Sequence, residues 1–341
     1  MRTLKIKFTD FWHGFDPENN YFFRLLLKSF YVEITDTPDI LIYSCYGKDY
    51  LRYKCLRVFY TAENLRPDFS GCDFAISFDY NSRPNHYRLP LYSLYIEQAN
   101  ALPSLMVQLT REDATAAWRQ KDKFCCMVVS NENSKKRLDF FKKLYAYKKV
   151  DSGGKVLNNI GGTVKDKMEF IKDYRFVISF ENQTHNGYTT EKILEPLIAG
   201  CIPIYWGNPN IGNDFNPGSF INFSNDKTDE QLINEIIAID NNEQLAIEIL
   251  MQPKFNGNKI PVEIDTENVL IFFQEIAGSI ETTTPVAKTP FGYFHFYKIK
   301  FKYYLAIVKS LYDRTIFKKA VVKKTDKIRS ATVVKQVLKK L

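Results

Sequence analysis

The sequence lacks any long run of uncharged apolar residues. A helix needs about 20 such residues to span a bilayer, and no run in the 341 residues approaches that length. The first residues are basic, but Asp10 interrupts them before the apolar core of a signal peptide could form. We therefore expect a soluble, non-secreted chain.

Metal-binding and disulfide patterns are also missing. The six cysteines include no Cys-x-x-Cys pair and there are only four histidines, so the ligand spacing of a zinc site is absent. Reduced cysteines in apolar strands behave as small core residues, which favours a reducing compartment. With 45% hydrophobic and 15% aromatic residues, the chain has enough apolar material for a substantial core.

Positive charge is concentrated at one end of the chain. The formal net charge is +8, and residues 309–341 hold eleven Lys or Arg against two acids. The rest of the chain is nearly neutral, so the basic excess belongs to a tail. A membrane- or nucleic-acid-binding protein governed by this tail is one hypothesis. The neutral body favours a basic segment appended to another kind of protein, and we expect no nucleic-acid partner.

The first hundred residues alternate short apolar runs with a helical pattern. The pattern of Glu18–Phe30 is typical of a helix, with one apolar face made of Tyr21, Phe22, Leu25 and Leu26. Buried strands are predicted at Leu4–Phe8, Asp39–Ser44, Arg57–Thr61 and Asp73–Phe78. Strands separated by helical stretches favour βαβ units and a parallel sheet.

A second alternating series follows residue 120. Strands are predicted at Phe124–Ser130, Arg175–Phe180 and Cys201–Trp206, and helices at 134–147, Thr190–Ala199, Thr228–Ala238 and Glu243–Met251. Ser134 is expected to cap the first helix and Gly200 to end the second. Leu138, Phe141 and Leu144 are expected to face inward. The whole pattern predicts two open α/β sheets in tandem with a cleft between them.

Three segments are expected from this organisation. Residues 1–117 would form an N-terminal domain and residues 118–284 a C-terminal domain, with a crossing between them within residues 99–120. Residues 285–341 are an aromatic and basic segment, and near its end apolar residues recur at helical spacing: Val334, Val337, Leu338 and Leu341. A basic amphipathic helix suits an anionic membrane surface. The alternatives are a solvated charged tail or a helix that packs on the body.

The stretch from Phe176 to Phe223 carries most of the functional information. A strand ends at Phe180, a polar loop of about eight residues follows, and a helix opens at Thr190. The free N–H groups of a helix N-terminus make an anion site at the carboxyl end of a sheet. Lys192 adds a positive charge in the first turn, which an anion such as a diphosphate would neutralise. The alternative is an ordinary surface lysine.

Several short motifs follow one another in this stretch: Phe180-Glu181-Asn182, Gly187-Tyr188, Thr190-Glu191-Lys192-Ile193, Ile202-Pro203-Ile204-Tyr205-Trp206-Gly207 and Asp214-Phe215-Asn216-Pro217. Together they resemble the signature of the glycosyltransferase family 10 fucosyltransferases, the α-1,3/4-fucosyltransferases, and most of all their bacterial members. The resemblance extends upstream to Arg57-Val58-Phe59-Tyr60-Thr61-Ala62-Glu63-Asn64, Tyr87-Arg88-Leu89-Pro90 and Ser152-Gly153-Gly154. It covers most of residues 57–223.

The resemblance implies a GT-B fold, in which two Rossmann-like domains face a cleft. It places the acceptor site mainly in the N-terminal domain and GDP-fucose in the C-terminal domain. It also implies an inverting enzyme that needs no bound metal and no other cofactor. The sequence contains no Asp-x-Asp, the usual metal-chelating device of nucleotide-sugar enzymes, so basic side chains are expected to neutralise the leaving diphosphate.

The resemblance also assigns residues to the donor site. Arg137 matches the family's pyrophosphate-binding arginine, and the planar fork of its guanidinium suits phosphate oxygens. Lys192 would be the second phosphate ligand, and Tyr188 matches a donor-contacting tyrosine. Glu181 and Asn182 are expected to bind substrate within the same motif. The alternatives are a solvated helix residue for Arg137 and simple packing for Tyr188.

Two carboxylates are expected to be catalytic. Glu191 matches the family's donor-site glutamate, which would bind a sugar hydroxyl or stabilise the cationic fucosyl group; alternatively it is an acid favoured by the helix dipole. Inversion needs a base that takes the proton of the acceptor hydroxyl. Glu63 follows a strand and lies where open α/β sheets present their sites, and it matches the family's proposed base. Its alternative is a surface turn acid.

The expected activity is transfer of fucose from GDP-fucose to the GlcNAc of a β-galactosyl-GlcNAc (LacNAc-type) acceptor, with α-1,3 linkage, in cell-surface polysaccharide or lipopolysaccharide. Alternatives are another nucleotide-sugar donor, an α-1,4 or other acceptor linkage, or a catalytically inactive carbohydrate-binding relative. The sequence favours a bacterial cytoplasmic protein, peripheral on the inner membrane.

Overall fold

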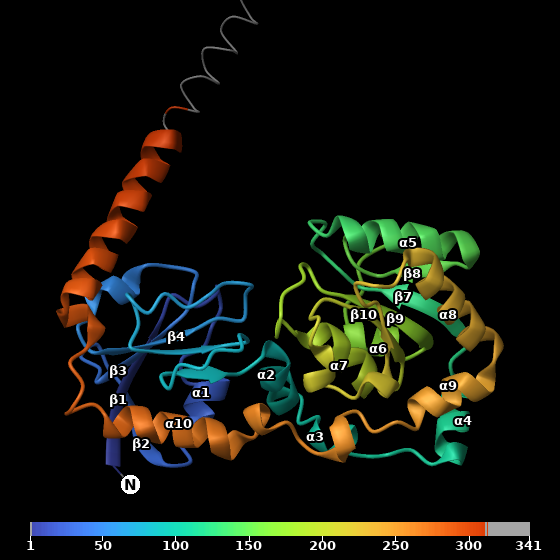
Figure 1. Ribbon diagram of the computed structural model, residues 1–341, viewed down its shortest axis with the longest axis horizontal. Helices are drawn as coiled ribbons and strands as arrows, with labels where there is room; N and C mark the ends of the chain where they lie inside the picture. Colours follow the sequence, from blue (N-terminus) through green and yellow to red (C-terminus); the bar gives the residue numbers. More distant parts are fainter. Residues whose placement is uncertain (1, 311, 313–341) are drawn as a thin grey trace, which may run out of the picture.

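The computed structural model describes residues 2–310 and residue 312. It contains two parallel β-sheets, each covered by helices (Figure 1). The strands of the first sheet, in the order β2-β1-β3-β4-β5-β6, are β1 (Arg2–Thr9), β2 (Phe30–Ile34), β3 (Ile40–Tyr43), β4 (Leu56–Tyr60), β5 (Phe74–Ser77) and β6 (His86–Arg88). The strands of the second sheet, in the order β11-β10-β9-β7-β8, are β7 (Lys123–Met127), β8 (Val150–Ser152), β9 (Tyr174–Phe180), β10 (Ile202–Trp206) and β11 (Ile221–Asn222).

The helices lie on both faces of these sheets. The α-helices are α1 (Tyr21–Leu26), α2 (Leu91–Gln98), α3 (Leu102–Leu105), α4 (Arg111–Gln120), α5 (Lys135–Tyr147), α6 (Lys167–Ile171), α7 (Glu191–Ile198), α8 (Asp229–Asn241), α9 (Glu243–Leu250) and α10 (Thr266–Gly278). Short 3-10 turns are η1 (Asp49–Arg52), η2 (Ile211–Asn213), η3 (Pro217–Ser219), η4 (Asn256–Asn258), η5 (Val262–Ile264) and η6 (Val286–Lys288). A further helix occupies residues 290–310.

The predicted strands are confirmed. Their apolar residues explain why they lie in the interior of the domains. Every residue of β3 and of β4 is buried, as expected for central strands of a parallel sheet that is covered on both faces. In the second sheet β9 and β10 pair in parallel, and α7 between them ends before Gly200, whose φ of +64° suits glycine at the C′ position.

The predicted helix Glu18–Phe30 is too long at both ends. The helix α1 covers only Tyr21–Leu26, and Phe30–Ile34 forms β2 at the edge of the first sheet. The run Phe-Tyr-Val-Glu-Ile alternates buried and exposed positions and favours a strand. In α5, Phe140 is buried together with Phe141 and Leu144, whereas Leu138 is only half-buried.

The core of the first domain includes residues far beyond the domain boundary predicted at residue 117. Buried residues of β1, β3 and β4 form one cluster with six residues of α10: Val269, Leu270, Phe272, Phe273, Ile276 and Ala277. In Figure 1 α10 lies along the first sheet. The boundary at residue 284 is therefore wrong, because the chain leaves the second domain and adds α10 to the first. Phe273 is fully buried, and its truncation to Ala would cost about 3–5 kcal/mol.

The other crossing also differs from the boundary at residue 117. Ala114 and Trp118 of α4 belong to the second core, together with residues of β7, β9 and β10. The chain therefore passes from the first domain to the second through α3 and the residues before α4 (Figure 1). The second domain is inserted between β6 and α10 of the first, and α2 packs against helices of both domains, α1 and α7.

The helix at residues 290–310 begins against the first domain and extends away from it (Figure 1). Near its start His295 is buried, and its ring nitrogens lie 2.7 Å from the Tyr50 hydroxyl and 3.0 Å from the Ser70 hydroxyl. Beyond it the side chains are mostly exposed. The expected apolar positions Val334, Val337, Leu338 and Leu341 lie outside the described residues. Among the helices that the structure describes, none is long and apolar enough to cross a membrane.

Candidate active site

The carboxyl ends of several strands from both sheets face each other across the domain boundary. Glu63 follows β4, and the loop 181–190 follows β9. The two segments meet directly, because the Asn64 side chain donates a hydrogen bond of 2.6 Å to Gln183. Ligands of open parallel sheets bind at the carboxyl ends of the strands, so the candidate site lies here.

On the first domain, Glu63 borders an open cavity. The cavity has a volume of about 740 Å³ and is lined by aromatic and polar side chains that include Trp12, Tyr46, Tyr95 and Glu97. Glu63 is exposed, and its Oε1 accepts a hydrogen bond of 2.7 Å from the Tyr46 hydroxyl. An exposed carboxylate beside a partly aromatic cavity can accept a proton from a sugar hydroxyl bound there.

On the second domain, three charged residues form a cluster at the start of α7: Glu181 is buried, and Glu191 and Lys192 are partly exposed. Glu181 is fully buried and accepts hydrogen bonds of 2.8 Å from the backbone N–H and the hydroxyl of Thr190. The Lys192 Nζ lies 3.2 Å from a carboxylate oxygen of Glu181 and 3.2 Å from one of Glu191. Thr190 caps the helix, so this arrangement is fixed by the backbone as well as by charge.

The pKa values of these three residues reflect burial and the presence of one lysine beside two carboxylates. Burial lowers the pKa of Lys192, but Glu181 and Glu191 outweigh it and raise that pKa above its ordinary value. Burial raises the pKa of Glu181 despite Lys192. Burial also acts to raise the pKa of Glu191, but Lys192 and Lys167 outweigh it and lower that pKa. Lys192 and Glu191 are therefore charged at neutral pH, and Lys192 keeps 17% of its side chain exposed.

Tyr188 lies between the two domains. It is 5% exposed, and its ring packs edge-on against Phe78 of the first domain at a centroid distance of 5.0 Å. Burial raises the pKa of its hydroxyl, which keeps that hydroxyl protonated and able to donate. A tyrosine in this position can pack against Phe78, and it can also contact a donor substrate.

Arg137 is placed differently from a solvated helix residue. Its side chain is fully buried and donates to the Phe180 carbonyl at 3.1 Å, to Asn182 Oδ1 at 3.1 Å and to the Asn131 carbonyl at 2.5 Å. Its Nε has no partner among the described residues. The arginine thus joins the start of α5 to the end of β9, directly beside Glu181, and contact with a phosphate stays a prediction.

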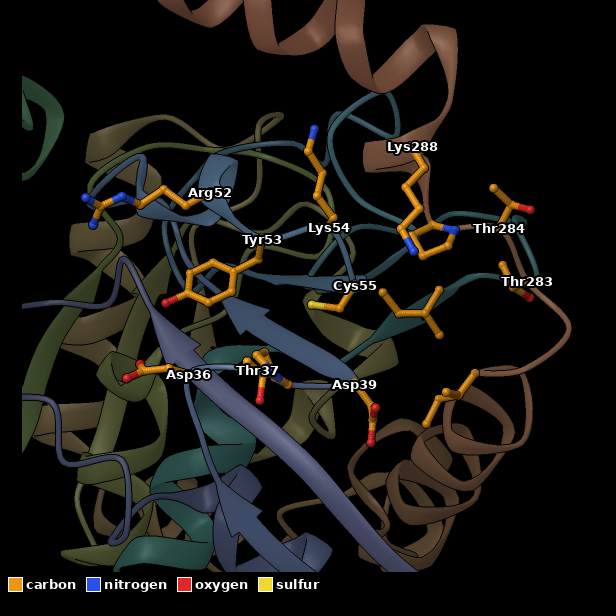
Figure 2. A pocket seen from close by; sticks show the side chains of 14 residues that line it. Asp36, Thr37, Asp39, Arg52, Tyr53, Lys54, Cys55, Thr283, Thr284 and Lys288 are labelled. Atoms are coloured by element: carbon orange, nitrogen blue, oxygen red, sulfur yellow. The ribbon is translucent and has the colours of Figure 1, made fainter.

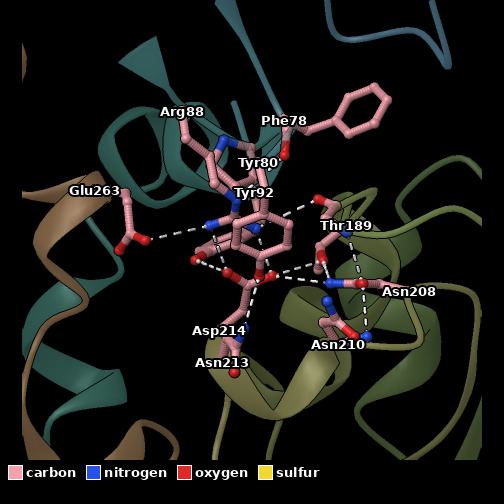
Figure 3. A network of polar contacts seen from close by, with 12 residues as sticks. Phe78, Tyr80, Arg88, Tyr92, Thr189, Asn208, Asn210, Asn213, Asp214 and Glu263 are labelled. Carbon is pink, nitrogen blue, oxygen red and sulfur yellow. Dashed lines mark hydrogen bonds and ion pairs between the residues drawn. The ribbon is translucent and has the colours of Figure 1, made fainter. Parts of the chain in front are cut away.

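A buried ion pair fastens the two domains beside this site (Figure 3). Arg88 of β6 holds both carboxylate oxygens of Asp214, at 2.9 and 3.0 Å. Thr189 and Tyr92 donate to the same carboxylate, at 2.8 and 3.2 Å, and Asn208 donates to it at 3.2 Å. Because Thr189 directly precedes the cap of α7, this network positions the charged cluster relative to the first domain.

A second hollow lies at the opposite ends of the first sheet (Figure 2). It measures about 690 Å³ and is lined by Asp39, which precedes β3, by Cys55, which precedes β4, and by Lys288 from η6. It is lined by two acidic side chains, Asp36 and Asp39, and three basic ones, Arg52, Lys54 and Lys288, and by none of the site residues expected from the sequence. We therefore place the candidate site at the carboxyl ends of the strands.

Some residues of the site were not found from the sequence. Tyr46 and Trp12 come from loops after β3 and β1, and nothing in their local pattern links them to Glu63. Asp214 and Arg88 lie in motifs that carried the family resemblance, but their pairing was not foreseen. Across residues 2–310 and residue 312, no group of three or more His, Cys, Asp or Glu side chains is placed to hold a metal ion.

Comparison with known families gives two matches. A model described as the alpha-(1,3)-fucosyltransferase FucT N-terminal domain matches residues 6–95. A model described as the glycosyltransferase family 10 (fucosyltransferase) C-terminal region matches residues 118–249. Together they cover well over half of the chain. The chain belongs to glycosyltransferase family 10. The family inferred from the motifs between residues 57 and 223 is thereby confirmed.

Individual relatives extend this finding. The Helicobacter pylori alpha-(1,3)-fucosyltransferase FucT is 31% identical over 275 residues, which are 69% of this chain and 55% of that protein. The Drosophila melanogaster alpha-(1,3)-fucosyltransferase B is 29% identical over 189 residues, 50% of this chain and 42% of that protein. The Xenopus tropicalis GDP-fucose protein O-fucosyltransferase 3 is 31% identical over 195 residues, 51% of this chain and 39% of that protein. The chain spans about half or less of the length of these relatives.

A solved structure supports the fold independently. The crystal structure of an alpha1,3-fucosyltransferase with GDP-fucose matches with a TM-score of 0.70 and 26% sequence identity, over 83% of this chain and 93% of that chain. The GT-B architecture of two Rossmann-like domains is thereby confirmed.

Proposed function

We propose that the protein is an inverting fucosyltransferase that moves fucose from GDP-fucose to the 3-hydroxyl of GlcNAc in a LacNAc-type acceptor of a cell-surface glycan. The observation that carries the proposal is that two unlike sites, one on each domain, both lie near Tyr188. An open cavity with an exposed carboxylate, Glu63, lies on the first domain, and a charged cluster of Glu181, Glu191 and Lys192 lies at a helix N-terminus of the second.

In the proposed reaction Glu63 is the general base. The acceptor oxygen bonds to the anomeric carbon of fucose while its proton passes to Glu63. The bond between that carbon and the β-phosphate oxygen breaks, and the electron pair leaves with GDP. General base catalysis contributes about 10²- to 10⁴-fold to the rate.

Residues on the donor side would stabilise the charges that develop on the diphosphate and on the fucosyl group in this step. Lys192 and Arg137 are proposed as phosphate ligands, with Tyr188 and Asn182 contacting the donor. Glu191 would stabilise the positive charge on the fucosyl group, and Glu181 would hold Lys192 in place. We propose no metal or other cofactor, because the sequence lacks Asp-x-Asp and these basic side chains lie at the helix N-terminus.

The names of the relatives support fucose as the transferred sugar more firmly than they support any one acceptor. All three carry the word fucosyltransferase, but two are named for α-1,3 transfer and one for transfer to protein. Transfer to another hydroxyl, including α-1,4 linkage, is therefore the second candidate. A panel of LacNAc, its isomer with a free 4-hydroxyl and unrelated glycans would separate these acceptors.

The first experiment incubates the protein with GDP-fucose and N-acetyllactosamine in the presence of EDTA and measures product mass. A gain of one deoxyhexose is expected for the wild type, and a rate at least a hundredfold lower for Glu63→Gln. Glu33→Gln removes an exposed carboxylate of β2 in the same domain and is the matched control. A Glu63→Gln variant with the wild-type rate would remove the base assignment, and GDP release without product would mean a wrong acceptor.

We further propose that the C-terminal helix attaches the enzyme to the cytoplasmic face of a bacterial inner membrane. Between residues 290 and 310 it exposes large aromatic side chains, among them Phe291, Phe294, Tyr297 and Phe301, interspersed with lysines. Such a surface binds anionic lipid through apolar burial and charge together. Co-sedimentation with anionic but not with neutral vesicles is expected, and Phe294→Ser with Phe301→Ser should abolish it. Equal recovery with both vesicle types would contradict the proposal.

A further inference from the structure

The contact between Tyr46 and Glu63 joins two loops whose backbones are each held in place. The Tyr46 N–H donates to the Asp10 carbonyl at 2.9 Å, and a Cβ on the next residue, Gly47, would collide with the Asp10 carboxylate. On the other side, the Glu63 N–H donates to the Thr61 hydroxyl at 3.1 Å. With both backbones fixed, the main remaining freedom of Glu63 is the rotation of its side chain.

A glutamate side chain that rotates freely is a poor base, because only one of its rotamers meets the acceptor. Ordering a side chain of this length costs up to about 2 kcal/mol. The Tyr46 hydroxyl supplies a 2.7 Å hydrogen bond that selects one arrangement, and hydrogen bonds to a charged group are among the stronger ones. The Tyr46 ring is itself held edge-on by Trp12, at a centroid distance of 6.4 Å.

The contact also divides the two carboxylate oxygens between two tasks. Oε1 of Glu63 accepts from Tyr46, whereas Oε2 accepts no hydrogen bond from any residue that the structure describes. Burial and the nearby Glu63 raise the pKa of the Tyr46 hydroxyl, so this hydroxyl stays protonated and remains a donor. Tyr46 and Glu63 both line the cavity on the first domain.

We propose that Tyr46 is a positioning residue for the base: its hydroxyl holds Oε1 of Glu63 and leaves Oε2 for the acceptor hydroxyl. This inference rests on the proposed function of Glu63. In the reaction the acceptor proton moves to Oε2, and the Tyr46 proton stays in place and continues to hold Oε1. Tyr46 therefore gives up no proton and accelerates the reaction only by fixing the carboxylate.

The test compares Tyr46→Phe with the wild-type full chain in steady-state transfer of fucose to N-acetyllactosamine. The variant loses one hydroxyl and keeps the ring against Trp12. We expect kcat to fall about tenfold and KM for GDP-fucose to stay unchanged, because the donor side is untouched. Tyr31→Phe removes a hydroxyl from an exposed tyrosine of β2 and is expected to keep wild-type kinetics.

A double variant separates positioning from a structural role. Because Tyr46 acts through Glu63, Tyr46→Phe combined with Glu63→Gln should be no slower than Glu63→Gln alone. A further tenfold loss in the double variant, or a wild-type kcat in Tyr46→Phe, overturns the inference while the proposed function stands. A wild-type rate in Glu63→Gln overturns the base and this inference together. No transfer by the wild-type chain overturns the proposed function itself.

Discussion

The two domains hold the carboxylates of the candidate site in opposite ways. Glu63 on the first domain is exposed and its side chain accepts one hydrogen bond. Glu181 on the second is fully buried and is tied to Thr190 and Lys192. A base must receive a proton from an arriving hydroxyl, whereas groups that meet developing charge act best when fixed in advance. The first domain therefore leaves its carboxylate accessible to an acceptor, whereas the second domain holds its charged groups in a fixed arrangement.

Breaking the join between the two sides should have the largest effect. Arg88→Met leaves Asp214, which is 1% exposed, as a buried charge without its partner. We expect the free energy of unfolding to fall by about 3–5 kcal/mol, because removal of one member of a buried pair is far costlier than its net contribution. Urea unfolding measures this loss.

A matched control for this change lies in the same domain. Arg24 pairs with Glu97 at 2.6 Å, but both side chains are more than a third exposed. Arg24→Met should therefore cost no more than about 1 kcal/mol. Equal losses in the two variants would contradict the view that the Arg88 network fastens the domains.

The preorganised side can be tested through Lys192. In Lys192→Gln the cluster keeps two neighbouring carboxylates without their cation. We expect kcat/KM for GDP-fucose to fall about a hundredfold or more, because the loss of one charged contact in the transition state has that size. Lys172→Gln, which removes an exposed lysine paired with Glu169, is the control. A change confined to the KM for the acceptor would mean that Lys192 acts on the acceptor and not on GDP-fucose.

Acid should destabilise the first domain through a buried histidine. His86 of β6 is 9% exposed, and burial lowers its pKa to about 4. The unfolded chain binds a proton at about pH 6.5 and the folded chain does not, so stability is full above that value. It should fall by up to about 3 kcal/mol as the pH drops from about 6.5 to 4.

The histidine effect has a direct check. His86→Asn should flatten the pH dependence of unfolding in this window, whereas replacement of the exposed His13 should leave the dependence intact. If acid destabilised the wild type and His86→Asn to the same extent, His86 would not be the responsible group.

The smallest effect is expected at the contact beside the base. Asn64 donates to Gln183 at 2.6 Å, and Gln183 is exposed. A double-mutant cycle with Asn64→Ala and Gln183→Ala should give a coupling energy of about 0.5–1 kcal/mol in urea unfolding. A coupling of several kcal/mol would mean that this contact, as well as the Arg88 network, fastens the two domains.

Much of the second domain could be predicted from sequence because its signals are local. The strands β9 and β10 are apolar runs, α7 lies between them, and Gly200 marks its end. Glu181, Glu191 and Lys192 lie within twelve consecutive residues, so a local sequence motif contains the whole cluster.

The first domain was harder because its contacts join distant parts of the chain. Tyr46 and Glu63 lie on loops after different strands, and only the order of the sheet brings them together. The helix α10 has an ordinary amphipathic pattern, which does not specify which of two apolar sheets it covers. Edge strand β2 was missed because its apolar positions continued the pattern of α1.

The return of α10 to the first domain has a consequence for synthesis on the ribosome. Residues 1–98 emerge first, but their core includes Phe273 and Ile276, which are made after the whole second domain. Domains generally fold as units during synthesis, so the second domain can close while the first still lacks a wall of its core. The part of the enzyme translated first is thus completed last, and its apolar sheet face stays uncovered until α10 arrives.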